Sequence, residues 1–492
     1  MVLWLLLFLG LFTYLILQRS VATVTRTPVW ILWLVMMTPA LIWCVWALIY
    51  GQNQPMPLAV AIGPFLICPP IYWWLIHLGR REAMPPKQPA DTDLTDLAEE
   101  SPQTDDSKKD RPSVRPITQA EETQLRDCFP WSTYYLQNIE YRPQAVICWG
   151  RLRTNPQEAY QTVEEKITAL FGDRFLLVFR ETLNRKPFFA LVPNPYREAA
   201  EGQKPELITR PAFALALLVI ALFTTTRFGV QLVGMADKLP ANPALLLKGL
   251  PYALALMTIL GVHELAHYLT ARFYQIRTTL PYFIPLPFFL GTFGAFIQMR
   301  SPVPNRKALF DISIAGPLAG FVVTVPLLVW GLAHSQVVPS LPSAGMLTFD
   351  ALNPNFFLLL SLLSKLALGS ALSAGKAISL HPVAVAGYVG MIVTAFNLMP
   401  VGALDGGHIV HAMFGQRTSL IVGQIARFLM LILSFIRPEL LLWALLLIVM
   451  PIRDEPALND VSELDNRRDF LGLIALALLV LILLPAPRIL FN

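Results

Sequence analysis

The segment GVHELAHYLTARF, residues 261–273, places two histidines and a glutamate in a stretch that otherwise suits a membrane helix. It follows LLLKGLPYALALMTIL, residues 245–260, which is apolar enough to lie in lipid. An ionisable side chain at the centre of a bilayer costs at least about 2.5–3.5 kcal/mol, so it is rarely kept there without a use. The segment therefore predicts a site inside a membrane helix, built on His263, Glu264 and His267.

The composition of the whole chain also places most of it in a bilayer. Of its 492 residues, 55% are hydrophobic and only 14% are charged, whereas a soluble globular chain has about 25% charged residues. Because about 20 apolar residues cross the hydrocarbon core, we predict a polytopic α-helical membrane protein with about ten spans, at residues 2–18, 29–50, 58–79, 211–234, 246–271, 308–333, 381–400, 418–435, 437–452 and 469–487. The apolar piece 353–369 is short and contains Lys365, so we expect it to be interfacial or re-entrant.

The positive charges predict an orientation, because short loops rich in Lys and Arg stay in the cytoplasm. Arginines follow the first and third predicted spans, and more Arg and Lys residues lie between the fifth and sixth. The connector GQNQPMP between the second and third spans has no charge. This pattern places the N-terminus outside and the polar region 80–210 inside. The net charge of +5 is small and scattered, so we expect no nucleic acid partner.

The N-terminus and the cysteines add two expectations. The first segment, MVLWLLLFLGLFTYLILQ, lacks the basic region and the small-residue cleavage site of a signal peptide, so we expect a retained span. No Arg-rich and Ser-rich transit peptide precedes it, which favours a bacterial protein or one encoded in an organelle. The four cysteines show no metal-type spacing and suggest no disulfide framework; they are Cys44, Cys68, Cys128 and Cys148.

A polar region interrupts the predicted spans. Residues 82–116 combine Pro, Asp, Ser and Lys with almost no bulky apolar residue, which is typical of a disordered linker. Residues 117–205 instead predict a small soluble α+β domain. Within it, a helix begins after the N-cap Asn155, and three strands are expected at 145–153, 174–182 and 187–194. Its role is either stabilising or regulatory, the latter including substrate filtering.

The spacing in HELAH suits a metal ion. Positions i and i+4 of a helix share a face, so His263 and His267 can bind one cation. Glu264 lies about 100° around the helix from His263, close enough to reach a metal-bound water without being a ligand. A catalytic zinc has three protein ligands and an open position for water, which a carboxylate base helps to activate. The alternative is a set of hydrogen-bonded polar groups in a helix interface, as in a transporter or proton relay.

A third ligand must lie at the same membrane depth. The predicted spans 246–271 and 381–400 run in the same direction, and Asp405 follows the second of them in NLMPVGALDGGHIVHAMFG. We predict Asp405 as the third ligand because its negative charge offsets part of the charge of zinc; the alternative is a turn residue in LDGG. His408 is the competing ligand. Asn397 is expected either to hydrogen-bond a peptide backbone or developing oxyanion, or simply to end its helix.

With both motifs in place, the sequence resembles the site-2 protease family of intramembrane zinc metalloproteases over residues 211–452. The stretch FFLGTFGAFIQMRSP, residues 288–302, resembles the glycine-containing β-hairpin loop that dips beside the active site in that family, and AGPLAG, residues 315–320, resembles its small-residue packing motif. The resemblance implies a six-helix core and one Zn²⁺ per chain. It also implies roles for seven residues: His263, His267 and Asp405 as ligands, Glu264 as general base, and Asn397, Gly291 and Gly294 as substrate contacts.

The stretch YRPQAVICWGRLRTNPQEAY, residues 141–160, resembles the cyanobacterial and plant-plastid branch of the family. That branch typically has Gly-Asn-Leu-Arg where this chain has GRLR at 150–153, and relatives elsewhere often have Asn at the position of Gly320. These departures concern the soluble domain and the substrate contacts and leave the ligand set unchanged. A multi-pass protein of the bacterial plasma membrane or the thylakoid membrane is implied, with the soluble domain and the active-site side in the cytoplasm.

Together these features divide the chain into five parts: an extension of three spans at 1–81, the linker 82–116, the α+β domain 117–205, the protease core 206–455, and a linker with an extra span at 456–492. The implied function is hydrolysis of a peptide bond in or near a transmembrane segment of a membrane-anchored protein. Zinc-bound water would be the nucleophile and Glu264 the base. An anti-sigma factor or a membrane-tethered regulator would suit as substrate, and the oligomeric state is left open.

Two alternatives come from other functional classes. A metal-ion or proton transporter could use the same polar site, and a non-catalytic scaffold could keep the motif without cleaving anything. A transporter needs polar residues along the opposite half of its spans. Outer halves such as AVAGYVGMIVTA, residues 384–395, offer few of them. The sequence therefore favours the protease.

Overall fold

The structure is a computed structural model of the chain. It describes residue 14 and residues 27–50, 58–78, 116–142, 145–182, 186–195, 211–239, 241–287, 290–340, 348–373, 375–437, 440–452 and 454–487. The chain forms two compact units, Met1–Thr92 and Asp93–Asn492.

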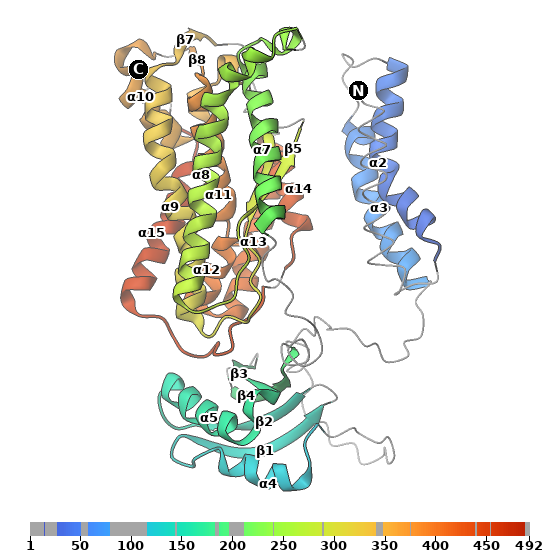
Figure 1. The fold of residues 1–492 in the computed structure, drawn as a ribbon, viewed down its shortest axis with the longest axis vertical. Coiled ribbons are helices and arrows are strands. Elements are labelled where there is room, and N and C mark those ends of the chain that lie inside the picture. Colours follow the sequence, from blue (N-terminus) through green and yellow to red (C-terminus); the bar gives the residue numbers. More distant parts are fainter. Residues whose placement is uncertain are drawn as a thin grey trace. The chain divides into compact units, whose positions relative to one another are not determined.

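Within residues 27–78 of the first unit, the described segments form two helices, α2 (Val29–Tyr50) and α3 (Leu58–Leu78), which run side by side (Figure 1). They coincide with the helices predicted at 29–50 and 58–79. The Thr27 hydroxyl donates a hydrogen bond to the carbonyl of Leu75 at 2.8 Å, so the start of one helix is tied to the end of the other. The predicted first span, 2–18, lies outside the described residues except for residue 14, and the predicted linker 82–116 except for residue 116.

The second unit begins with the predicted α+β domain. Its antiparallel sheet has the order β1-β2-β4-β3, formed by Tyr134–Arg142, Ala145–Leu152, Pro187–Pro193 and Phe175–Glu181 in that order. Helix α5 (Pro156–Phe171) buries a stripe of residues at helical spacing against the sheet: Ala159, Tyr160, Val163, Ile167 and Phe171. Asn155 caps α5 by accepting a hydrogen bond from the Gln157 amide at 2.9 Å. The three predicted strands, the helix and its cap are thus confirmed.

Two elements of this domain were not predicted. Helix α4 (Gln119–Asp127) starts at a capping box in which Thr118 and Glu121 exchange hydrogen bonds, a pattern that is visible in the sequence. Strand β1 lies at the edge of the sheet and has a register shift between Leu136 and Asn138. A bulged edge strand does not alternate cleanly between apolar and polar residues, so its pattern is hard to recognise.

The centre of the second unit is a helical bundle in which α8 (Leu246–Phe273) packs against α7 (Pro211–Leu232), α9 (Arg306–Ala333) and α11 (Pro382–Asn397) (Figure 1). Small residues let the helix backbones approach closely, as is common in membrane bundles. A Cβ atom built on Gly249 of α8 would lie 2.0 Å from the Thr226 carbonyl oxygen of α7. One built on Gly331 of α9 would lie 2.3 Å from the Ala384 nitrogen of α11.

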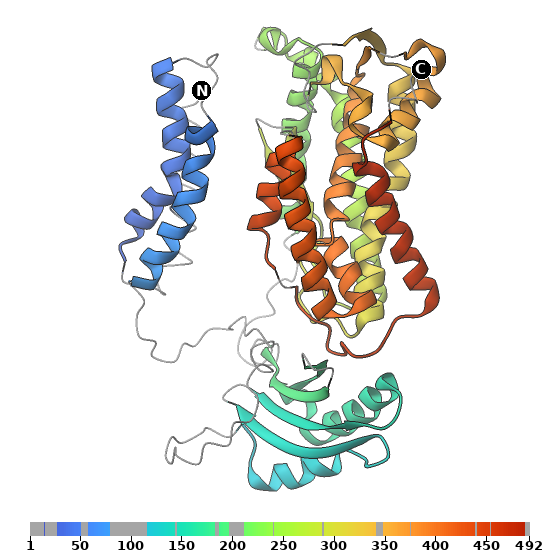
Figure 2. The same cartoon turned by 180° about the vertical axis from the view of Figure 1, so that it is seen from behind.

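Four more helices complete the bundle: α12 (Asp405–Phe414), α13 (Gln416–Ile436), α14 (Leu441–Val449) and α15 (Asn466–Leu483). Figure 2, seen from behind, shows α15 in dark red along the side of the bundle, where it packs against α9, α11 and α12. The apolar piece predicted at 353–369 forms the short helix α10 (Leu358–Leu368). The strands β7 (Gln336–Pro339) and β8 (Lys376–Ser379) pair near it.

Within the described residues, four helices are long and apolar enough to cross a membrane: α7, α8, α9 and α13. They correspond to four predicted spans. The prediction of a span at 437–452 is wrong, because α14 has 9 residues, which rise about 13 Å against a hydrocarbon core of about 30 Å. Helix α11 has 16 residues and is shorter than the predicted 381–400, since His381 caps its start and Leu398 ends it before Pro400.

A β-hairpin lies between α8 and α9. Its strands are β5 (Tyr282–Leu286) and β6 (Gly291–Phe296). Two side chains of the bundle hold its turn: the Tyr252 hydroxyl donates to the Leu290 carbonyl at 2.8 Å, and the Thr224 hydroxyl donates to the Gly291 carbonyl at 2.6 Å. The hairpin is therefore fixed to α7 and α8 and not left loose in the membrane region.

Candidate metal centre

Helix α8 presents His263 and His267 one turn apart on the same face. The helix runs unbroken through the motif because residues 252–273 contain no proline and a single glycine. The two Nε2 atoms lie 3.1 Å apart, and the residues are only 4% and 6% exposed. Two imidazoles that lie so close together, are buried and point to one place can bind the same ion.

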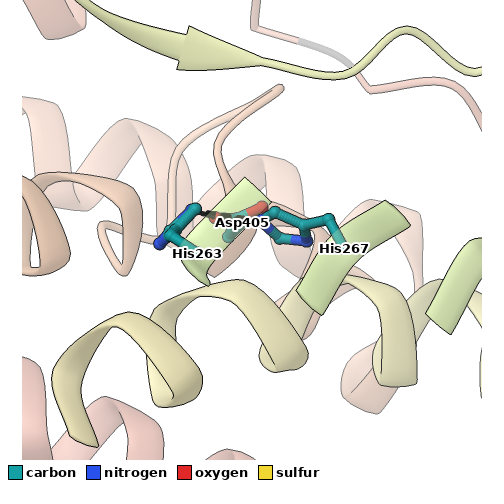
Figure 3. A group of neighbouring side chains, drawn as sticks. All are labelled: His263, His267 and Asp405. Atoms are coloured by element: carbon teal, nitrogen blue, oxygen red, sulfur yellow. Dashed lines mark hydrogen bonds and ion pairs between the residues drawn. The ribbon is translucent and has the colours of Figure 1, made fainter. Parts of the chain in front are cut away.

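Asp405 reaches the same point from the first residue of α12. Its Oδ2 atom lies 3.5 Å from His263 Nε2 and 3.4 Å from His267 Nε2, and Figure 3 shows the three side chains converging. Two imidazole rings at this distance favour the ionised form of the Asp405 side chain. The turn alternative does not apply, because Asp405 begins a helix.

The glycines of LDGG let α12 start this close to the preceding loop. A Cβ on Gly406 would lie 2.0 Å from the Leu398 carbonyl oxygen, and one on Gly407 would lie 2.3 Å from the Gly402 carbonyl oxygen. Larger residues would push the first turn of α12, and Asp405 with it, away from α8.

The donor set fits a zinc ion. Four ligands at about 2.0–2.1 Å in tetrahedral geometry are separated from each other by roughly 3.3 Å. The three separations between His263, His267 and Asp405 are 3.1, 3.5 and 3.4 Å. Two imidazoles and one carboxylate leave a fourth position open, as in catalytic zinc sites. Among the residues that the structure describes, these three form the one group of His, Cys, Asp or Glu side chains spaced for a metal ion.

Neighbouring groups orient the two rings. His267 Nδ1 lies 2.7 Å from the Ile312 carbonyl of α9, which places the proton on Nδ1 and leaves the Nε2 lone pair for a metal. Gly316 and Gly320 of AGPLAG face the two histidines: a Cβ on Gly316 would lie 2.1 Å from His267 Nε2, and one on Gly320 would lie 3.2 Å from the His263 ring. Gly316 thus makes room for the Nε2 atom of His267, and Gly320 for the side chain of His263.

Glu264 and Asn397 lie beside the cluster. Glu264 is 7% exposed, and its carboxylate is in contact with the backbone of Ile297, directly after β6. The Asn397 amide nitrogen lies 3.2 Å from His263 Nε2, at the last residue of α11. Both predicted residues are therefore within reach of a molecule bound at the centre.

His408 points away from the cluster. Its Nδ1 lies 3.1 Å from an oxygen of Asp454, in the segment that follows α14. Of the two predicted candidates for the third position, the structure thus brings Asp405, and not His408, to the histidine pair.

Of the two hairpin glycines predicted to contact substrate, one has a clear packing role. Gly291 has φ +82°, and a Cβ there would lie 2.3 Å from the Thr225 Cα of α7. Gly294 has φ +120° with open space where a Cβ would be. Close packing explains Gly291, while Gly294 leaves room beside β6.

Two features of the site were missed. AGPLAG was interpreted as helix packing alone, although its spacing of four residues matches that of the histidines it faces. A buried network that joins His411 to Asp454 and Asp460 was not anticipated either. Its aspartates lie in a polar stretch that looks like a surface linker, so no sequence signal pointed to it.

Comparison with known proteins agrees with this geometry. A model of peptidase family M50 matches residues 251–436, and a model of the EGY3 middle domain matches residues 123–199, within the α+β domain. No solved structure matches the chain.

Three curated proteins show the extent of the similarity. "Probable zinc metalloprotease EGY2, chloroplastic" of Oryza sativa subsp. indica is 31% identical over 368 residues, which are 73% of this chain and 65% of that protein. The protein of the same name from Arabidopsis thaliana is 31% identical over 366 residues, 73% of this chain and 63% of its own length. "Probable zinc metalloprotease EGY1, chloroplastic" of Arabidopsis thaliana is 30% identical over 394 residues, 73% and 69% of the two chains.

The chain thus spans 63–69% of the length of these relatives. The M50 match includes His263, His267 and Asp405, which the fold gathers at one point, and Glu264 beside them. By these matches and this geometry, the chain belongs to peptidase family M50.

Proposed function

We propose that the protein is an intramembrane zinc metalloendopeptidase that cleaves a peptide bond in or near a transmembrane segment of a membrane-anchored protein. The observation that carries this proposal is the cluster of His263, His267 and Asp405, with Glu264 beside it, on a helix apolar and long enough to cross a membrane. The names of the relatives, zinc metalloproteases, support the same chemistry.

Zinc, when bound, would lower the pKa of a coordinated water and polarise the scissile carbonyl. The other tasks belong to the chain itself. His263, His267 and Asp405 hold the ion, and the Ile312 carbonyl keeps the ring of His267 in place. Glu264 takes a proton from the attacking water and returns it to the leaving amine, as a general base and then a general acid. Asn397 hydrogen-bonds the substrate backbone close to the scissile bond.

The hairpin is suited to presenting an extended peptide. A transmembrane helix hides its amides in its own hydrogen bonds, so the substrate must unwind locally before it can be cleaved. Strand β6 ends at Phe296, the backbone of the next residue, Ile297, contacts Glu264, and Gly294 leaves space beside the strand. A substrate strand that pairs with β6 would bring its backbone toward the metal centre.

The location and topology follow the same reasoning. Relatives named chloroplastic favour a plastid membrane, and of the two predicted membranes this favours the thylakoid. Four helices suit membrane crossing; α2, α3, α11 and α15 would bring the total toward the predicted ten. By the distribution of Arg and Lys, the α+β domain and the metal centre face the cytoplasm, or the equivalent stromal side. A membrane-tethered regulator or an anti-sigma factor would suit as substrate.

A transporter that uses the same residues finds less support. A transport path needs polar side chains on both sides of the site. In the first half of α11, from Val383 to Val389, every residue is buried and all but Tyr388 are small or aliphatic. That half of α11 gives an ion no charged or imidazole ligand.

Glu264→Gln tests the proposal because it removes the base and keeps the shape. We expect a full zinc content and a cleavage rate at least about 100-fold lower, measured on a membrane-spanning substrate in liposomes with purified full-length protein. Glu165→Gln, in the exposed part of α5, is the matched control and should cleave normally. Undiminished cleavage by pure Glu264→Gln protein would refute the assigned base.

A further inference from the structure

Residues 454–462, DEPALNDVS, join the metal centre to the α+β domain, and we name them the strap. They lie between α14 and α15 and have the composition of a solvated linker. The structure nevertheless buries most of them: Asp454, Asn459, Asp460, Val461 and Ser462 are each 9% exposed or less. Buried polar groups are costly unless they are paired, so the partners of the strap show what it holds together.

At one end the strap extends the sheet of the α+β domain. Strand β3 is at the edge of that sheet. The Phe179 amide of β3 donates to the Leu458 carbonyl at 2.7 Å, and the Asp460 amide donates to the Phe179 carbonyl at 2.9 Å. Val461 is buried in the hydrophobic core of the same domain. The strap thus forms an isolated parallel bridge to the edge strand β3, supplied from between two helices of the bundle.

Its other edge pairs with the bundle. The Leu458 amide donates to the Val303 carbonyl at 2.9 Å, and the Asn459 amide donates to the Pro304 carbonyl at 3.0 Å. These carbonyls belong to the two residues before Asn305, the N-cap of α9. The strap therefore holds the α+β domain on one side and the start of α9 on the other.

The aspartates of the strap bind a histidine of α12. His411 is 0% exposed; its Nδ1 lies 2.6 Å from Asp454 Oδ2 and its Nε2 lies 2.9 Å from Asp460 Oδ1. With a carboxylate at each ring nitrogen, both nitrogens carry protons and the ring is an imidazolium. Arg306 donates to the same Asp460 oxygen at 3.0 Å, and His408 adds a second link to Asp454.

This network ends at the two helices that face α8 across the metal centre. Helix α12 begins with Asp405, six residues before His411. Helix α9 begins with Arg306 and carries Gly316 and Gly320, which face the two histidine rings. Docking of the α+β domain and placement of the Asp405 carboxylate therefore share one set of contacts.

We propose that the strap makes the α+β domain a positioning device for the metal centre: strand pairing at Phe179 fixes Asp460, the Asp454–His411–Asp460 contacts fix α12, and α12 fixes Asp405. His411 is the positioning residue in this chain of contacts. The inference rests on the proposed zinc site and not on peptidase activity. It gives the α+β domain a task in the proposed reaction, which is to keep the ligand aspartate in reach of the histidine pair.

The first test is zinc affinity, measured by competition with a chromophoric chelator on the full chain in detergent. His411→Gln removes the charged ring between two carboxylates and should weaken zinc binding about tenfold, the lower end of the effect of losing an outer-shell contact. Arg174→Gln is the control. Arg174 also donates to a carboxylate, that of Glu121, but within the α+β domain and outside the strap. It should bind zinc like the wild type. Equal weakening of zinc binding in both variants would mean that the loss reflects general destabilisation of the protein and not the contacts of the strap.

The second test acts from the domain side and leaves every charge in place. Val461→Ala and Val163→Ala each remove two methyl groups from the core of the α+β domain, but only Val461 belongs to the strap. We expect Val461→Ala to weaken zinc binding and to alter the absorption bands of the Co²⁺-substituted protein, and Val163→Ala to do neither. This pair also keeps the proposal testable if His411→Gln fails to fold.

Combining the variants tests the path itself. If the contacts run through His411, then adding Val461→Ala to His411→Gln should weaken zinc binding no further. Independent, additive effects would overturn the path. The two possible failures can be distinguished. If the ligand assignment is wrong, Asp405→Ala will bind zinc normally. If only the strap proposal is wrong, Asp405→Ala will lose zinc binding and His411→Gln will bind zinc normally.

Discussion

Gly316 determines how closely α9 approaches the ring of His267. A Cβ at that position would lie 2.1 Å from the Nε2 atom, where no side-chain carbon fits. One turn further along, Gly320 faces the His263 ring at 3.2 Å, which a small shift would relieve. The two glycines of AGPLAG thus differ in what they leave room for: one leaves space for the nitrogen that we propose binds zinc, and the other only packs.

Gly316→Ala should therefore destroy the centre without unfolding the helix. Alanine favours a helix over glycine by about 1 kcal/mol, so α9 itself should not weaken. The methyl group would displace the His267 ring and its bond to Ile312, and we expect zinc affinity to fall about 100-fold or more. Gly320→Ala is the control and should lose much less. Chelator competition measures both, and similar affinities for the two variants would contradict this reading.

At this scale the sequence predicted much of the site. The spacing of His263, Glu264 and His267 is sufficient to predict a shared face, because helix periodicity fixes it. Asp405 was reached by matching the direction of two predicted spans. The environment of Gly316 could not be predicted in this way, since it depends on how two helices cross. Nor could His408 be dismissed before its partner Asp454 was located.

Among the elements, α12 shows how a short helix can be held firmly. It has 10 residues, and four side chains belong to the network of its His411: His408, Asp454, Asp460 and Arg306. Burial lowers the pKa of His411, but Asp460 and Asp454 outweigh it and raise that pKa to about 9. Burial raises the pKa of Asp460, but His411 and Arg306 outweigh it and lower that pKa.

These shifts predict how stability depends on pH. A histidine with a raised pKa stabilises the fold fully below its unfolded pKa of about 6.5, and loses that contribution as the pH rises through about 9. The aspartate contribution is present above about pH 4 and is lost as the pH falls. At pH 6 the His411 part amounts to about 3 kcal/mol at most. Thermal unfolding of wild type and His411→Gln should therefore differ between pH 5 and 7 and converge toward pH 10; a gap that stays constant to pH 10 would argue against a charged His411.

Short elements were the least predictable ones. Apolar length alone predicted full spans at 381–400 and 437–452, but α11 ends at Asn397 and α14 has 9 residues. Length does not reveal where loops and caps end a helix. Strand β1 was missed because an edge strand with a bulge lacks a clean alternation.

For the whole molecule, composition predicted a helical membrane protein with a small α+β domain, and the domain appears at the predicted place with its three predicted strands. The contact between that domain and the helical bundle could not be predicted. The contact joins Phe179 to residues 458–460, which are far from it in the sequence. Those residues lie in a stretch whose composition indicates a linker. Long-range pairing of this kind leaves no periodic pattern in a single sequence.

The central claim is that Asp405 completes a zinc centre with His263 and His267. The most direct test is the metal content of purified wild type, Asp405→Ala and His408→Ala, determined by elemental analysis at equal protein concentration. We predict one zinc per chain in the wild type and in His408→Ala, whose ring faces Asp454, and little or none in Asp405→Ala. A full complement of zinc in Asp405→Ala would contradict the account.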